Sequence, residues 1–157
     1  MKKYNLSFIS DEDLYSHTKD TVEKYRFQVD LARFNRNLID PIKLTFDSKV
    51  YDREIQSVIE SEIVRQMDKS NTNHIGYFHQ NIFNYIGSGW SVPVNGYDIV
   101  NLDEHYYVEM KNKHNTMNSS SSQKTYMRMQ NTLLNNHDAT CMLVEVVARN
   151  SQNIVWN

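Results

Sequence analysis

Residues 96–111 read GYDIVNLDEHYYVEMK and predict a β-hairpin that brings two acids and a lysine to one face of a sheet. If residues 103–104 form a two-residue turn, the numbers of paired residues add up to 207 and Asp98 lies directly opposite Glu109. The Cβ atoms of directly opposed residues are roughly 5 Å apart. Lys111 shares this face because side chains alternate along a strand. A register slip of one residue would separate the two acids.

The paired acids suit a metal-dependent nuclease. Hydrolysis of a phosphodiester needs a better nucleophile than free water and a counter-charge for the phosphate, and Mg²⁺ on carboxylate oxygens supplies both. In this interpretation Asp98 and Glu109 bind the metal with the backbone carbonyl of Met110, and Lys111 positions the attacking water. A solvated sheet face on which both acids pair with Lys111 is the alternative. The spacing leaves this choice open, as it does the number of metal ions.

The composition indicates a single globular domain. The chain has 157 residues, of which 39% are apolar, enough for one hydrophobic core. It has no apolar run of membrane-spanning length and no signal-peptide pattern at its start, so a cytoplasmic location is expected. Cys141 is the only cysteine, which excludes an intramolecular disulfide and a cysteine-based zinc site.

The charge is distributed unevenly, although the net charge is only -2. Residues 110–137 contain no acid, so a local positive surface directly follows the paired acids. An ordinary solvated face is the alternative for this segment. Its basic side chains are Lys111, Lys113, Lys124 and Arg128.

Three helices are predicted before the hairpin. The first covers about residues 10–25, and Ser10 fits the N-cap of a capping box. Asp40-Pro41 breaks the helical pattern, and a second helix is expected from about Ser48, where apolar residues begin to recur at helical spacing. A third amphipathic helix is predicted over residues 75–86.

A helix and a strand are predicted after the hairpin. A serine among residues 119–122 is the expected N-cap of the helix. The helix should turn four side chains inward: Tyr126, Met129, Leu133 and Leu134. Residues 139–148 form a nearly continuous apolar run, typical of a strand covered on both faces.

The order strand, helix, strand predicts a right-handed parallel crossover onto the hairpin, with Ile99, Val108 and Met110 in a core on the face away from the acids. The fold class is therefore α/β, a small mixed β-sheet flanked by helices. We expect a single nuclease domain over residues 1–157. Its part up to about residue 90 should be mainly helical, and residues 96–148 should form the catalytic hairpin, helix and strand.

The stretches 96–100 and 107–119 resemble type II restriction endonucleases of the PD-(D/E)XK superfamily, and more narrowly the group that cleaves GGNCC. Residues 46–51, 76–80 and 126–130 are similar to the same group, so the resemblance covers roughly residues 34–148. It implies that Asp98 and Glu109 are the motif acids and Lys111 the motif lysine.

Two departures accompany this resemblance. The superfamily pattern has proline before the first acid, where this chain has Tyr97. Members of the group are longer, so a chain truncated at its C-terminus is expected, with part of a recognition surface or dimer interface missing. The superfamily often adds a glutamate from a preceding helix, and here Glu62 or Glu54 would fill that role at the metal.

The resemblance implies a Mg²⁺-dependent site-specific endodeoxyribonuclease of a restriction-modification system, which cuts double-stranded DNA at a short palindrome such as GGNCC. A palindromic site implies a homodimer and a methyltransferase that protects the same site. Contacts to phosphates are expected from Lys113, Lys124 and Arg128, and contacts to bases from Asn115, Asn118, Gln123 and Gln130.

Three alternatives stay open. A repair or junction-resolving nuclease of the same superfamily would recognise the shape of DNA rather than its sequence. A catalytically inactive DNA-binding module would bind without cutting. A globular domain with no role on nucleic acids would show no salt-dependent affinity for DNA.

Overall fold

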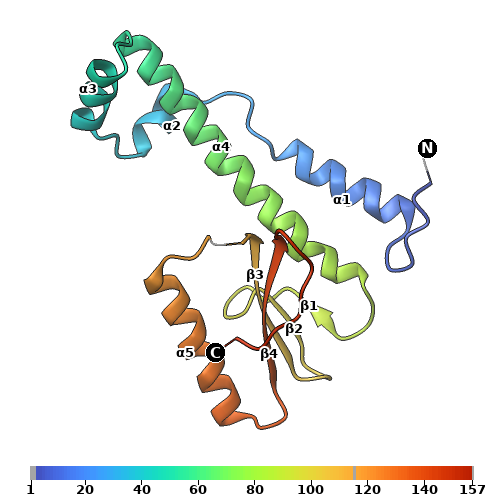
Figure 1. Cartoon of the computed structure of the whole chain (residues 1–157). Helices are drawn as coiled ribbons and strands as arrows, with labels where there is room; N and C mark the ends of the chain where they lie inside the picture. The colour runs from blue at the N-terminus through green and yellow to red at the C-terminus, as the bar shows by residue number, and fades with distance from the viewer. Residues whose placement is uncertain (1–2, 115, 157) are drawn as a thin grey trace. The chain divides into compact units, whose positions relative to one another are not determined.

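The computed structural model describes residues 3–114 and 116–156, which divide into two compact units (Figure 1). Unit 1 comprises the residues up to 19 and those from 76 onward, and unit 2 comprises residues 20–75. The described residues contain helices and a four-stranded mixed sheet, which confirms the α/β class. Within residues 3–114 and 116–156, no helix is long and apolar enough to cross a membrane. The expectation of a single domain stays a prediction.

The sheet of unit 1 has the strand order β1-β2-β3-β4. Strands β2 (Ile99–Asn101) and β3 (Tyr106–Lys113) are antiparallel, and Ile99 pairs with Val108, which is the predicted register. Strand β4 (Thr140–Val147) runs parallel to β3, so the predicted parallel crossover is confirmed. The short strand β1 (Trp90–Ser91) lies at the other edge, antiparallel to β2.

The loop between β2 and β3 differs from the expected two-residue turn. Four residues, 102–105, separate the strands, and His105 has a positive φ of 55°. Asp103 and Glu104 do not have the positive φ that tight two-residue turns require, so the chain uses a longer loop. The Asn101 side chain stabilises this loop by accepting a hydrogen bond from the Glu104 backbone N–H at 3.1 Å. The pairing register is the same as predicted because the longer loop adds one residue, 102 or 105, on each side of the expected turn.

Both faces of the sheet are covered by apolar side chains. On one face Ile99, Val108 and Met110 are buried, as predicted, and pack with Phe83 of the 3₁₀ helix η1 (Ile82–Tyr85). On the other face Tyr97 and Val100 pack with Met129 of helix α5 (Ser119–Asn135). Burial of each such large side chain contributes roughly 1.5–3 kcal/mol. Glu109 in β3 and Asp98 directly before β2 are therefore held by a sheet that is packed on both faces.

Helix α5 packs through a different stripe from the one predicted. Thr125 and Met129 are its buried residues, whereas Tyr126, Leu133 and Leu134 are exposed, so their predicted inward orientation is wrong. Hydrogen bonding explains part of the shift, since the next turn of the buried stripe places Thr132 Oγ1 2.8 Å from the Tyr97 hydroxyl. The expected serine N-cap is wrong as well. Asn118 caps the helix instead and accepts a hydrogen bond from the Ser121 backbone N–H.

The first helix begins as predicted. Helix α1 (Asp11–Glu23) follows Ser10, whose hydroxyl oxygen accepts a hydrogen bond from the Asp13 backbone N–H at 3.0 Å. Asp40-Pro41, expected to break the helical pattern, begins helix α3 (Pro41–Val50). Asp40 accepts hydrogen bonds from the first backbone N–H groups, and proline is tolerated at a first helical position.

The predicted second and third helices are one element. Helix α4 (Ile55–Asn81) is continuous and leads into η1, so the start at Ser48 and the separation of the two helices are wrong. A turn at residues 51–52, where Asp52 has a positive φ, ends α3 and delays the start of α4. No helix-breaking residue lies between residues 55 and 81, since Gly76 alone is tolerated within a helix.

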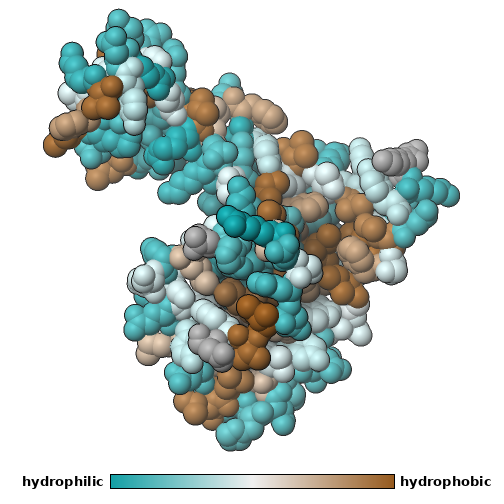
Figure 2. All heavy atoms as spheres, viewed as in Figure 1, coloured by the Kyte–Doolittle hydropathy of each residue, from teal (hydrophilic) through white to brown (hydrophobic). Residues whose placement is uncertain are grey.

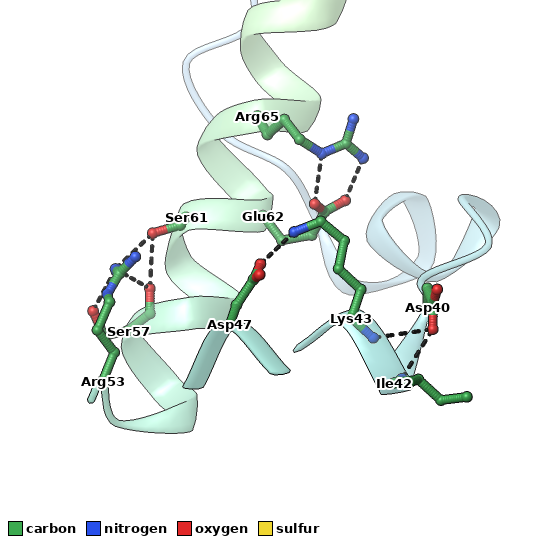
Figure 3. A network of polar contacts seen from close by, with 9 residues as sticks. All are labelled: Asp40, Ile42, Lys43, Asp47, Arg53, Ser57, Ser61, Glu62 and Arg65. Carbon is green, nitrogen blue, oxygen red and sulfur yellow. Dashed lines mark hydrogen bonds and ion pairs between the residues drawn. The ribbon is translucent and has the colours of Figure 1, made fainter. Parts of the chain in front are cut away.

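Unit 2 has little core. Besides part of α4 it contains α3 and the short helix α2 (Leu31–Arg36), and its buried residues are Val58 and Gln66. Figure 2 shows hydrophobic side chains at the surface among hydrophilic ones. Polar contacts within α3, between Arg53 and the first turns of α4, and along α4 are more prominent (Figure 3). They join Lys43 to Asp47, Arg53 to Ser57 and Ser61, and Glu62 to Arg65.

Candidate active site

The structure brings Asp98, Glu109 and Lys111 together on the face of the sheet that α5 covers. Asp98 directly precedes β2, and its Oδ2 accepts a hydrogen bond from the backbone N–H of Met110 at 2.8 Å. This bond holds the Asp98 carboxylate beside Glu109, the neighbour of Met110 in β3. Lys111 Nζ donates to Glu109 Oε1 at 2.6 Å. Two carboxylates and one amine therefore form a single cluster.

Glu109 is buried, with 7% of its surface exposed, although it is charged. Its Oε1 pairs with Lys111, and its Oε2 accepts a hydrogen bond from Arg128 of α5. A buried carboxylate is stable only when paired and hydrogen-bonded, and these two cations supply both conditions. The arrangement fixes the orientation of the Glu109 carboxylate from two elements, β3 and α5.

Arg128 also belongs to this cluster, although the sequence predicted it only as a phosphate contact and not as a partner of Glu109. Its guanidinium donates to Glu109 and to the Gly96 carbonyl, and its Cζ lies 4.8 Å from the centre of the Tyr97 ring. The signal in the sequence is its position one residue before the buried Met129, which places it at the edge of the stripe facing the sheet. The predicted phosphate contact of Arg128 stays a prediction, with the guanidinium already bound to Glu109.

The surroundings of Asp98 raise its pKa. Burial raises the pKa of Asp98, and the negative charge of Glu109 raises it further. The backbone hydrogen bond from Met110 and the charges of Lys111 and Arg128 lower this pKa without cancelling the rise. A metal ion bound beside Asp98 would favour its charged form, because an opposite charge lowers the pKa of a carboxyl group.

The donor set fits Mg²⁺. Within residues 3–114 and 116–156, no group of three or more His, Cys, Asp or Glu side chains could hold a metal ion. Mg²⁺ is commonly bound through one or two carboxylates plus substrate phosphates, and it keeps several waters. Asp98 and Glu109 supply such a pair. The predicted ligation by the carbonyl of Met110 stays a prediction.

Glu62, the predicted helper at the metal, belongs to unit 2. Its carboxylate accepts two hydrogen bonds from Arg65, each of 2.6 Å, and one from Gln66 at 3.1 Å (Figure 3). The bonds from Arg65 are the main reason that the pKa of Glu62 is lowered. Glu62 is thus a well-paired carboxylate within its own unit, and a role at the metal stays a prediction.

The other predicted DNA contacts are mostly exposed. Asn118 uses its side-chain oxygen to cap α5, and Asn115 lies outside the described residues. The four remaining side chains extend into solvent, one from the end of β3 and three from α5. They are Lys113, Gln123, Lys124 and Gln130. Their contacts with phosphates and bases stay predictions.

Comparison with known proteins bears on the identity of this cluster. The family model described as Eco47II restriction endonuclease matches residues 6–157. The chain is similar to the type II restriction enzyme Sau96I of Staphylococcus aureus, with 32% identity over 155 residues, which are 96% of this chain and 59% of the relative. It is also similar to the type II restriction enzyme Eco47II of Escherichia coli, with 33% identity over 71% of this chain and 48% of the relative.

The chain thus spans about half to three fifths of the length of these curated relatives. No solved structure matches the chain.

Proposed function

Because the chain belongs to the Eco47II restriction endonuclease family, we propose that it is a Mg²⁺-dependent type II site-specific endodeoxyribonuclease, and that Asp98, Glu109 and Lys111 carry its chemistry. One observation supports this assignment most strongly. Asp98 is bonded to the Met110 N–H while Glu109 is bonded to Lys111, so both acids and the amine share one sheet face. Such a grouping suits hydrolysis of a phosphodiester.

Each residue of the cluster has a distinct role in this proposal. Asp98 and Glu109 would hold the metal, and Mg²⁺ bound there would activate water and stabilise negative charge on the phosphate. Lys111 donates hydrogen bonds to the attacking water and to a phosphate oxygen. Arg128 is a positioning residue, because it keeps the Glu109 carboxylate oriented through its contacts with Gly96 and Tyr97.

The proposed substrate is double-stranded DNA with a short palindromic site, for which GGNCC is the candidate. A palindrome has two-fold symmetry, so a homodimer in which each subunit cuts one strand is the expected assembly. Lys113 and Lys124 would contact phosphates, and amide side chains of α5 would read base edges. A methyltransferase acting on the same site would protect host DNA, in the cytoplasm of a prokaryotic cell.

The test is incubation of the purified chain with unmethylated plasmid DNA and Mg²⁺, followed by sequencing of all fragment ends. We expect discrete fragments that end at one short palindrome, and no cleavage with EDTA or with Asp98→Ala. Ends scattered over many sequences, or concentrated at branched DNA, would favour the repair or junction-resolving nuclease. DNA binding without any cleavage under all conditions would favour the inactive binding module.

A further inference from the structure

Unit 2 contains an open surface depression, called the cavity below, that the proposed chemistry does not use. Its volume is about 510 Å³, within the range of small-molecule and cofactor sites. It is formed by the segment after α1, one residue of α2 and one residue of α4. The lining residues are Lys24, Tyr25, Arg26, Phe27, Gln28, Arg33 and His74.

The charge of this cavity is one-sided. Lys24, Arg26 and Arg33 are cations, His74 is a further basic group, and the lining contains no acid. The whole chain carries a net charge of -2, so a group of three cations around one cavity is opposite in sign to the chain as a whole. Cations gathered around one cavity create a local positive potential that attracts anionic ligands. The cavity therefore suits a phosphate-bearing ligand.

The segment that carries these cations is held in place. Asn71 of α4 accepts a hydrogen bond from the Arg26 backbone N–H at 2.9 Å and donates one to the Arg26 carbonyl at 3.2 Å. Asp30 caps α2 by accepting a hydrogen bond from the Arg33 backbone N–H at 2.8 Å. Two cations thus project from backbone that is already ordered, which reduces the entropic cost of binding a ligand.

An exposed aromatic ring accompanies the cations. Phe27 is 80% exposed, although it follows Arg26 directly and lines the same cavity. An apolar ring among cations suits a ligand that alternates anionic and apolar parts. The backbone of DNA does so, because each phosphate is followed by a deoxyribose, and protein contacts to phosphate and sugar make up most of a DNA interface.

We propose that this cavity is a second DNA-contact site, in which Lys24, Arg26 and Arg33 bind backbone phosphates and Phe27 packs against the intervening deoxyribose. The inference rests on the proposed nuclease function and extends it to unit 2. Contacts of this kind hold DNA without reading its sequence. They would add affinity to every site, cognate or not.

The test measures duplex DNA affinity over a series of NaCl concentrations, with Asp98→Asn in every protein so that no DNA is cut. Replacement of both Arg26 and Arg33 by Gln should weaken binding about tenfold or more and reduce the salt slope by about two phosphates. The matched control replaces Lys49 and Lys69, two exposed cations of unit 2 outside the cavity, by Gln. The control should keep most of the affinity and of the slope.

Phe27→Ala separates the two parts of the proposal. It removes no charge, so binding should weaken about fivefold while the salt slope stays unchanged. Inorganic phosphate at an ionic strength matched with NaCl should not displace the DNA. Strong displacement would overturn the assignment in favour of a site for a free phosphate compound.

Two other outcomes distinguish this inference from the proposed function. If the cavity variant and the matched control show the same affinity and slope, the second site is refuted while the nuclease assignment stands. If the protein that carries Asp98→Asn alone shows no salt-dependent DNA binding, both proposals fail.

Discussion

The two units of this chain are stabilised by different forces. In unit 1, apolar clusters pack on both faces of the sheet that carries the buried Glu109. In unit 2, Val58 and Gln66 are the buried residues, and helix caps and ion pairs are the prominent contacts. A cluster that must hold reacting groups within a fraction of an ångström needs rigid supporting elements. A surface that contacts the DNA backbone without reading its sequence tolerates more movement. The proposed cleavage chemistry in unit 1 and the proposed second DNA contact in unit 2 therefore match the packing of their units.

The largest expected effect isolates the chemistry in unit 1. Asp98→Asn removes one proposed metal ligand but keeps an oxygen that can accept the hydrogen bond from Met110. We expect cleavage to fall about 1,000-fold or more, since metal catalysis contributes several kcal/mol and each 1.4 kcal/mol is tenfold in rate. Rates of plasmid cleavage measure the loss. The control is Glu104→Gln, in the exposed loop of the same hairpin, which should keep full activity.

Core substitutions compare the stability of the two units. Ile99 is fully buried, so Ile99→Ala should cost about 2–5 kcal/mol of unfolding free energy and lower cleavage, although by less than Asp98→Asn does. Val58→Ala should act within unit 2 and leave most of the cleavage rate intact. Hydrogen exchange of the backbone amides measures both effects. Equal loss of protection in β2 and β3 in both variants would contradict the contrast between the units.

Arg128 tests how the buried acid is held. Arg128→Met leaves the Oε2 of Glu109 without its partner, and we expect a loss of about 1–3 kcal/mol in stability and roughly 10- to 100-fold in cleavage. Chemical denaturation and plasmid cleavage measure the two losses. Lys124→Met, one turn earlier on the exposed side of α5, should change neither stability nor the fold of unit 1. Unchanged cleavage in Arg128→Met would remove Arg128 from the proposed machinery.

The smallest expected effect concerns pH. Burial and the charge of Glu109 raise the pKa of Asp98 in the folded chain, so the charged Asp98 opposes folding at neutral pH. Without metal, Asp98→Asn should therefore be slightly more stable than the unchanged chain at neutral pH. The difference should begin to shrink as the pH falls to the raised pKa, and it should vanish below the ordinary pKa of an aspartate, where Asp98 is protonated in both the folded and the unfolded chain. Thermal unfolding at several pH values measures it, and a difference that grows toward low pH would contradict this sign.

The sequence was most informative where local alternation determines the structure. Asp98, Glu109 and Lys111 share a face because the register of a hairpin follows from the period of two. The packing of α5 could not be predicted in the same way. Its inward stripe depends on which residues meet the sheet, so Thr125 is buried where Leu133 and Leu134 were expected. The helix caps at Asp40 and Asn118 were missed because both residue types also occur in turns and linkers.

The central claim is that Asp98 and Glu109 hold a divalent metal ion. Electron paramagnetic resonance of Mn²⁺, a substitute for Mg²⁺, measures the free ion, and therefore the bound ion by difference, during titration of the whole chain. We predict saturable binding that weakens at least tenfold in Asp98→Asn and is unchanged in Glu104→Gln. Equal binding in Asp98→Asn and the unchanged chain would contradict the claim and place the ion elsewhere.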